Sequence, residues 1–219
     1  VKVMLTREDQ FNFGHPKTIS HQTCKAAIST NTALSPQSRL QGLKHELVAA
    51  PGSPGMMPVF SYADIDSEQP TMAMIDNARG AISGIDHWYD LEHTEVQYFY
   101  QKLMTDLIPV GHVRSVGNFY TVFAIESFID EVAHELDVDP LDLRLSLLKS
   151  RGRNSGARAR ATDDSDDLLM GAGQVTVGGG QRLANALKIA AGQANYGSPL
   201  QKRNSAQGIA IAAAENRWN

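Results

Sequence analysis

A stripe of apolar side chains over residues 118–136 constrains the fold of this chain more than any other feature. Its members recur at three- and four-residue spacing: Val122, Ile125, Ile129, Val132, Ala133 and Leu136. This spacing places side chains on one face of an α-helix. The charged residues of the segment lie mostly away from the stripe: Glu126, Asp130, Glu131, His134 and Glu135. The pattern predicts a long helix with one face in a core.

A glycine-bracketed turn comes directly before this helix. Gly111 and Gly117 flank Arg114, and backbone without Cβ atoms can approach a ligand closely. A helix N-terminus offers unpaired N–H groups to an anion, and arginine adds a forked, permanently charged donor. We expect Asn118 to cap the first helical turn. The sequence therefore predicts a ligand-holding turn on a rigid support.

Two further helices are expected. Asp139 is placed to cap a helix with Pro140 at its first position, and Leu141, Leu145 and Leu148 are its expected apolar face. Residues 182–191 form the other helix, and its core face is expected to hold these residues: Leu183, Leu187, Ala190 and Ala191.

Strands are expected at several places, including short ones at residues 1–5 and 175–180, which makes the fold class α+β, with mixed strands and packed helices. Residues 18–29 and 40–50 are expected to pair antiparallel through a polar connection, and residues 71–75 and 94–100 are rich in β-branched and aromatic side chains. Residues 208–214 are small and apolar, which favours a buried strand. Aromatic residues cluster in and just before the stretch 94–100: Trp88, Tyr89, Tyr98, Phe99 and Tyr100. No basic groove accompanies them, so core packing is favoured over base stacking.

Composition narrows the class of partner. Twenty basic and 24 acidic residues give a formal charge of −4, which offers no electrostatic reason to expect nucleic acid. No run approaches the ~20 apolar residues of a transmembrane helix. The single cysteine, Cys24, excludes an internal disulfide and any CxxC metal or iron–sulfur motif within the chain.

Charged groups outside the turn are weaker indications of a functional site than the turn itself. Glu126 and Asp130 are one helical turn apart, and a solvated or hydrogen-bonded face is favoured over a metal site. The seven histidines form no HxH or HExxH spacing, so no metal-ligating residue is predicted. Residues 150–180 carry a basic and then an acidic half without apolar periodicity. A solvated linker is favoured there over a phosphate clamp.

The run RSVGNFYTVFAIESFIDEVAHELDVDPLDLRLSLL, residues 114–148, resembles the molybdenum-cofactor-binding large subunit of the xanthine oxidase family. The resemblance is strongest to the branch of the isoquinoline 1-oxidoreductase beta subunit and bacterial aldehyde dehydrogenases. Other segments agree in order: VKVMLTREDQFNFGHPKT, LQGLKHELVAAPGS, DHWYDLEHTEVQY and RLANALKIAAGQANYGSPL. By this resemblance the chain is part of the molybdopterin-binding domain of a molybdenum hydroxylase.

The resemblance assigns roles to individual positions of the turn. Cofactor contacts are implied for these residues: Arg114, Ser115, Val116, Gly117 and Asn118. Val116 and Phe119 are expected at the substrate pocket, and no catalytic residue is expected within the chain. The implied cofactor is molybdenum bound to molybdopterin in its cytosine dinucleotide form, with iron–sulfur clusters on a partner small subunit. The implied substrate is a small aldehyde or N-heterocycle.

The family's GGGFG and GxGE segments, the second of which carries the general-base glutamate, are not found in the sequence. The resemblance therefore implies that the chain is a central part of a larger subunit. The rest of that subunit is then a partner, and the chain alone is expected to be inactive. Three regions are expected: residues 1–149 in the first cofactor-binding domain, residues 150–180 as a mobile excursion, and residues 181–219 at the start of the second half. For the location of the protein, the bacterial periplasm and the cytoplasm are both compatible with the sequence. The alternative is a non-catalytic binding or assembly module of the same fold.

Overall fold

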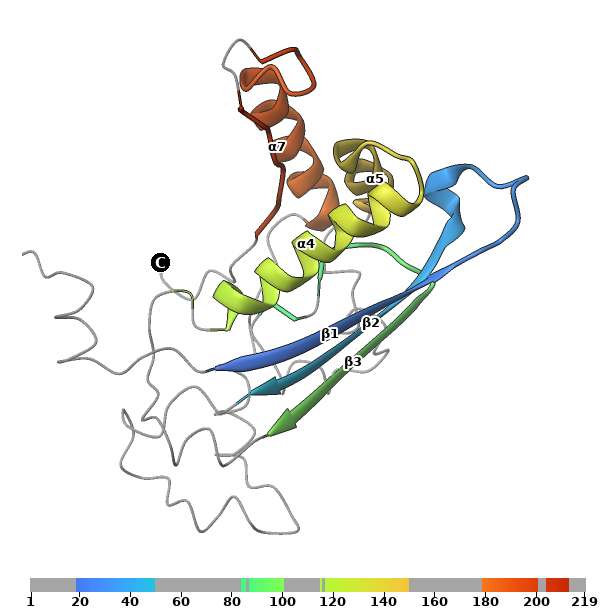
Figure 1. The fold of residues 1–219 in the computed structure, drawn as a ribbon, viewed down its shortest axis with the longest axis vertical. Coiled ribbons are helices and arrows are strands. Elements are labelled where there is room, and N and C mark those ends of the chain that lie inside the picture. Colours follow the sequence, from blue (N-terminus) through green and yellow to red (C-terminus); the bar gives the residue numbers. More distant parts are fainter. Residues whose placement is uncertain are drawn as a thin grey trace, which may run out of the picture.

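The computed structural model describes residues 19–49, 84–85, 87–100, 115, 117–149, 179–200 and 204–212. Within these residues the elements are β1 (Ser20–Ile28), the 3-10 helix η1 (Pro36–Arg39), β2 (Leu40–Ala49), β3 (His93–Tyr100), α4 (Asn118–Glu135), α5 (Pro140–Leu147) and α7 (Gly179–Gln193). The helices lie on one side of the sheet (Figure 1). The predicted α+β class is confirmed. The predicted division at residues 150–180 falls mostly outside the described residues and stays a prediction.

The described sheet has three strands in the order β1-β2-β3. β1 and β2 pair antiparallel, as the sequence predicted, and Cys24 lies opposite His45. β2 and β3 pair parallel, with His45 opposite Val96. The strands expected over 18–29, 40–50 and 94–100 are therefore confirmed, while the strand expected over 71–75 lies outside the described residues.

The two faces of the sheet differ in polarity because strand side chains alternate. Leu43, His45 and Leu47 of β2 are buried on the face toward α4. On the other face, the Lys44 ammonium contacts the carboxylates of Glu46 at 3.0 Å and Glu95 at 3.1 Å. The sheet thus covers a core on one side and presents ion pairs on the other.

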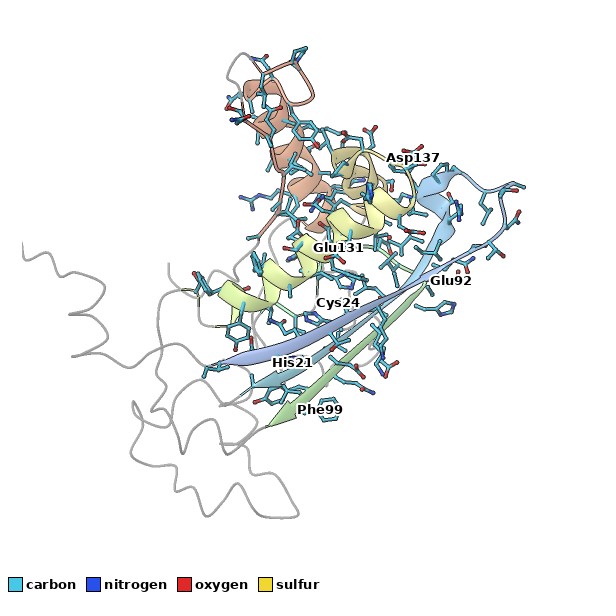
Figure 2. All side chains as sticks on the ribbon, viewed as in Figure 1. His21, Cys24, Glu92, Phe99, Glu131 and Asp137 are labelled. Carbon is cyan, nitrogen blue, oxygen red and sulfur yellow. The ribbon has the colours of Figure 1, made fainter. Side chains whose placement is uncertain are left out.

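Cys24 lies on the core side of β1, between that strand and α4 (Figure 2). Burial, and secondarily the charge of Glu131, raises the pKa of its thiol to about 11. The thiol therefore stays protonated at neutral pH, and protonated sulfur is a poor nucleophile and a poor metal ligand.

The long helix α4 supplies the centre of the core, as the apolar stripe predicted. Ile125, Ile129, Val132 and Ala133 are buried along its length. They join a core cluster that also contains residues of β2, α5 and α7. A separate cluster under the start of α4 consists of Leu47, Ala49 and Ile85, with Val96, Tyr98 and Tyr120 packed against it. Both ends of α4 are therefore held on the sheet side.

Helix α5 begins as predicted but buries a different face. The Asp139 carboxylate accepts hydrogen bonds from the N–H groups of Leu141 and Asp142, and Pro140 is the first helical residue. Its buried residues are Leu143, Arg144 and Leu147. Of the expected face, Leu148 directly after the helix is buried, while Leu141 and Leu145 are only partly buried. The face turns toward Leu143 because α5 packs against α4 and α7 at once.

In α7 the predicted core face is confirmed at Leu187 and Ala191, and Leu183 is partly buried against the core. Ala184, Leu187 and Ala191 are buried, whereas Ala190 is exposed. The buried strand expected over 208–214 is wrong for its described part, because residues 208–212 belong to no strand of the sheet and none of them is fully buried. The N–H of Ile211 donates to the Glu126 carboxylate instead of to a neighbouring strand.

His45 makes stability depend on pH. Its ring is fully buried, its Nε2 lies 2.8 Å from Gln22 Oε1, and burial lowers its pKa from 6.5 to about 4. The unfolded chain binds a proton here at a pH where the folded chain does not. The contribution of His45 to stability is therefore complete above about pH 6.5 and is lost as the pH falls through 4, by about 3 kcal/mol.

Urea unfolding of the wild type and of His45→Gln at pH 7.5, 5.5 and 4 measures this contribution. The variant is expected to show the smaller loss of stability between pH 7.5 and 4. The control is His93→Gln, because the side chain of His93 is 74% exposed. Equal pH slopes for the wild type and His45→Gln would contradict the prediction.

Candidate cofactor-binding site

The turn before α4 contains the described part of the predicted cofactor-contact residues. Ser115 is exposed and adopts a left-handed backbone conformation with φ 75°. Gly117 is buried and already helical, with φ −65° and ψ −31°, and α4 begins at Asn118. Arg114 and Val116 lie outside the described residues. An exposed left-handed residue next to a helix N-terminus places backbone dipoles where they attract an anionic group.

The expected cap by Asn118 is wrong. Gly117 occupies the N-cap position without a side-chain cap, and Asn118 is the first residue of the helix. The Gly117 carbonyl accepts hydrogen bonds from the N–H groups of Tyr120 and Thr121 and from the Thr121 hydroxyl, the last at 2.9 Å. A side-chain cap requires an extended residue before the helix, and Gly117 is not extended.

Gly84 lies against this first helical turn in a conformation that suits glycine, with φ 82°. A Cβ at Gly84 would stand 2.4 Å from Asn118 Oδ1 and 2.8 Å from Thr121 Oγ1. The side chain of Asn118 therefore faces the backbone of Gly84. The start of α4 is also tied to the sheet, because Gln22 Nε2 donates to the Tyr120 carbonyl at 3.0 Å.

Gly84→Ala is expected to lower the free energy of unfolding by about 2–4 kcal/mol, from left-handed strain of about 1 kcal/mol and overpacking of about 1–3 kcal/mol. Gly197→Ala is the matched control, because Gly197 has φ 79° but no atom lies within 4 Å of the place that an added methyl group would occupy. Thermal and urea unfolding compare the two. Equal losses would show that the contact with α4 contributes nothing.

Phe119, which the resemblance assigned to the substrate pocket, lies on α4 with 64% of its surface exposed. Phe123, one helical turn further, is 72% exposed. Because Val116 lies outside the described residues, the geometry of a pocket between Val116 and Phe119 stays a prediction.

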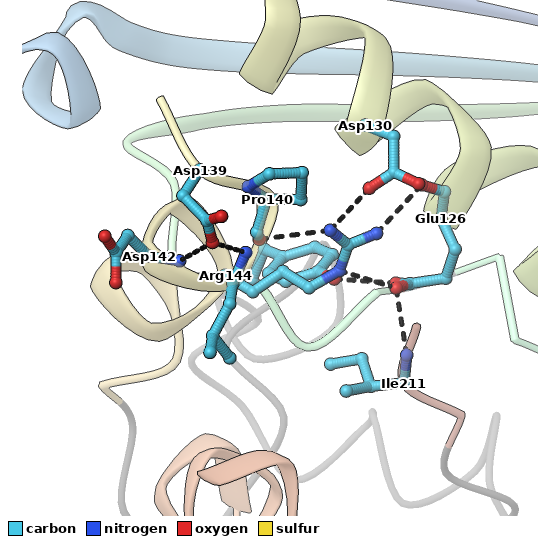
Figure 3. Close-up of polar contacts among 9 residues, drawn as sticks. Glu126, Asp130, Asp139, Pro140, Asp142, Arg144 and Ile211 are labelled. Atoms are coloured by element: carbon cyan, nitrogen blue, oxygen red, sulfur yellow. Dashed lines mark hydrogen bonds and ion pairs between the residues drawn. The ribbon is translucent and has the colours of Figure 1, made fainter. Parts of the chain in front are cut away.

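A buried charge network lies further along α4 (Figure 3). The Arg144 guanidinium is completely buried. Its Nε donates to Glu126 Oε2 at 3.0 Å, its Nη1 to Asp130 Oδ1 at 2.7 Å and to the Pro140 carbonyl at 3.1 Å, and its Nη2 to the Glu126 carbonyl at 3.0 Å. Arginine suits this position because its planar fork satisfies several acceptors at once.

Glu126 accepts two more hydrogen bonds from distant parts of the chain. The Tyr89 hydroxyl donates to Oε1 at 2.7 Å, and the Ile211 N–H donates to Oε2 at 2.9 Å. Burial and the Glu126 charge raise the pKa of Tyr89, so this hydroxyl keeps its proton. Although burial alone lowers the pKa of Arg144, the neighbouring carboxylates of Glu126 and Asp130 raise it overall.

Sequence reasoning found only part of this network. The hydrogen-bonded interpretation of Glu126 and Asp130 is confirmed, but a solvated position is wrong for Glu126, which is 6% exposed. Arg144 was not singled out. A signal was present, because Glu126 lies among the apolar positions of α4 and Arg144 among those of α5. A charge within the core face of each of two adjacent helices indicates a buried ion pair.

The described residues offer no alternative site with comparable chemistry. Their histidine, cysteine and carboxylate side chains form no group of three that would hold a metal ion. A surface hollow of about 470 Å³ involves Gly42 and His93, at the end of the sheet away from the Gln22 contact with α4. No described helix has the length and apolar character needed to cross a membrane.

Comparison with known proteins gives a family match that includes the positions of the predicted turn. Residues 66–147 match the family model of the molybdopterin cofactor-binding domain, a range that includes the turn, α4 and α5. Over 217 residues, the chain is 28% identical to the membrane-bound aldehyde dehydrogenase [pyrroloquinoline-quinone] of Gluconacetobacter polyoxogenes, and the alignment covers 99% of this chain and 24% of that protein. The chain thus spans about a quarter of the length of this curated relative.

A solved structure is also similar. The aldehyde oxidoreductase of Desulfovibrio gigas aligns with 88% of this chain and 17% of its own length, at 15% identity and a TM-score of 0.47. The family match and the curated relative confirm the resemblance seen in the sequence. Residues 66–147 match part of a molybdopterin cofactor-binding domain, which fits the resemblance of the chain to part of a large subunit of the xanthine oxidase family.

Proposed function

We propose that this chain forms part of the wall that holds molybdopterin in an oxidoreductase acting on an aldehyde or an N-heterocycle. One observation carries the proposal: the molybdopterin cofactor-binding match includes both the turn at 114–117 and the helix that supports it. The substrate class follows from the resemblance and from the aldehyde in the name of the Gluconacetobacter relative.

The described part of the turn fits such a group. Molybdopterin carries phosphate, and the left-handed, exposed Ser115 next to the N-terminus of an 18-residue helix suits an anion. The pterin dithiolene holds the molybdenum itself, so protein ligands to the metal are not required. The bound group supplies the redox chemistry, while the protein supplies binding and orientation.

Each residue of the turn has a proposed task. Arg114 binds anionic oxygen atoms of the cofactor through its guanidinium, and the backbone of residues 115–118 approaches the cofactor closely. Val116 and Phe119 shape the adjoining substrate pocket. Gly84, Gln22 and the buried Thr121 hold the start of α4 in place, so the turn does not need to reorganise when the cofactor binds.

The finer identity of the cofactor is also a proposal. The name of the Gluconacetobacter relative specifies pyrroloquinoline quinone, whereas the family that matches this chain is defined by molybdopterin. We favour molybdopterin because the family match falls directly on residues 66–147 of this chain. We further propose its cytosine dinucleotide form, an iron–sulfur small subunit as electron partner, and inactivity of this chain alone.

The test is to purify the chain from a host that makes the cofactor and to measure molybdenum, released cytidine nucleotide and pyrroloquinoline quinone. Arg114→Ala is expected to lower molybdenum retention about tenfold or more, the equivalent of one charge-assisted hydrogen bond. The control is Arg182→Ala, because Arg182 lies on the exposed face of α7. Equal molybdenum in wild type and Arg114→Ala, or quinone in place of molybdenum, would refute the assignment.

A second function has one specific observation in its favour. Phe119 and Phe123 are exposed one helical turn apart on α4, and adjacent exposed aromatic side chains are typical of interaction surfaces. A non-catalytic assembly module would use this face and hold no molybdenum. Measuring molybdenum in the purified wild type therefore separates the two functions.

A further inference from the structure

We propose that Glu126 is a positioning residue that connects the segments on either side of residues 150–178 and so sets their relative placement. Its carboxylate joins four parts of the chain. Arg144 of α5 and Tyr89 before β3 bind it from the N-terminal side, and Ile211 binds it from the C-terminal side (Figure 3). The Ile211 contact spans 85 positions of sequence.

The segment that carries Ile211 has few other bonds to hold it among the described residues. Residues 205–212 are neither helix nor strand. Ile209 and Ile211 are partly buried against the main core cluster, while Gly208, Ala210 and Ala212 are exposed. This alternation describes an extended strand-like segment with one apolar side on the core. Apolar contacts alone allow such a segment to slide along the core, because they are not directional.

The directional hydrogen bond to Glu126 fixes the position of the segment along the core. Its acceptor is a charged oxygen, and charge-assisted hydrogen bonds are shorter and stronger than neutral ones. Arg144 Nε holds the same oxygen at 3.0 Å and is itself completely buried. Arg144 and Tyr89 therefore hold the carboxylate independently of Ile211, and a single backbone N–H selects the register of the segment.

A second contact sets the other end of the segment. Gln207 Nε2 donates to the Ala194 carbonyl at 2.9 Å, and the Gly197 N–H donates to Gln207 Oε1 at 3.1 Å. These bonds tie the segment to the end of α7. The segment thus runs from α7 to the middle of α4, with Gln207 and Ile211 as its two fixed points.

The effect of Glu126 on cofactor binding rests on the proposed function. If residues 181–219 begin the second half of the cofactor-binding region, the Glu126 contact sets the position of that half relative to the turn at 114–117. Glu126 would then act on the cofactor only through the segment it positions.

The test compares Ile211→Pro with Ile211→Ala in the full chain. Proline removes the N–H donor, whereas alanine removes packing and keeps the donor. The N–H of Gly197 donates to Gln207 Oε1, and its exchange, measured by NMR, is expected to become about tenfold faster in Ile211→Pro and to change less in Ile211→Ala. Molybdenum retention is expected to fall in the same order.

A paired variant guards against misfolding of the proline variant. Glu126→Met combined with Arg144→Met removes both buried charges and the acceptor of the Ile211 N–H, and removing both charges preserves stability better than removing one. If Glu126 only stabilises the fold, this double variant retains near-wild-type amide exchange at Gly197, whose N–H donates to Gln207, and near-wild-type molybdenum. If Glu126 positions the segment, the double variant keeps most of its stability, but the N–H groups of Gly197 and Ile211 exchange faster. Glu135→Met is the control, at an exposed glutamate of the same helix.

The outcomes separate the inference from the proposed function. Wild-type exchange at Gly197 in both Ile211→Pro and the double variant overturns the inference. Faster exchange with unchanged molybdenum overturns the positioning role toward the cofactor. A wild type without molybdenum overturns the proposed function, while the exchange measurements still decide whether Glu126 positions the segment.

Discussion

Replacing Arg144 with methionine is expected to lower the free energy of unfolding by about 3–5 kcal/mol, the cost of leaving a buried charge without its partner. The variant leaves the buried Glu126 carboxylate without the guanidinium that donates to it at 3.0 Å. Asp130 suffers less, because its side chain is 46% exposed and can bind water. Urea unfolding at pH 7.5 measures the loss.

Arg182→Met is the control for this variant, because Arg182 is exposed on α7 and exposed substitutions usually change stability by less than about 0.5 kcal/mol. Adding Glu126→Gln to Arg144→Met is expected to restore most of the lost stability, because no unpaired charge then remains buried at Glu126. A loss below about 1 kcal/mol for Arg144→Met alone would show that the network contributes little.

Replacing Ile129 with alanine is expected to lower the free energy of unfolding by about 2–5 kcal/mol. Ile129 is fully buried at the centre of the core that joins α4 to β2, α5 and α7. The truncation removes three side-chain carbons and leaves a cavity where several elements meet. Thermal and urea unfolding both report the change.

The matched control is Ile189→Ala on α7, where the isoleucine is 62% exposed. Its loss is expected to stay within about 0.5 kcal/mol. Similar losses at the two positions would contradict the placement of α4 against the core.

Local features of the fold could be predicted because their causes are local. The three- and four-residue spacing of Ile125, Ile129 and Val132 is sufficient to define the buried face of α4. The start of α5 follows from Asp139 and Pro140 alone, because capping involves only adjacent residues. The antiparallel pairing of β1 with β2 follows from two apolar stretches separated by a short polar connection.

Features that depend on distant partners could not be predicted. β2 pairs in parallel with β3, which lies far along the chain, and no spacing in either strand specifies that partner. The face of α5 turns toward Leu143 and Leu147 because it packs against two helices, not one. The segment at 208–212 is apolar enough for a strand, yet its described backbone binds a carboxylate instead.

The candidate site likewise has features that could be predicted from the sequence and features that could not. The sequence of residues 114–148 was sufficient to identify the cofactor family, which the match over residues 66–147 confirms, because the turn and its helix are continuous in the chain. The roles of Arg114 and Val116 stay predictions. Only the tertiary structure decided that Glu126 is buried and binds Arg144, Tyr89 and Ile211. The physical reason is that a carboxylate in a helix is equally compatible with solvent and with a core, and the choice depends on whether distant donors reach it.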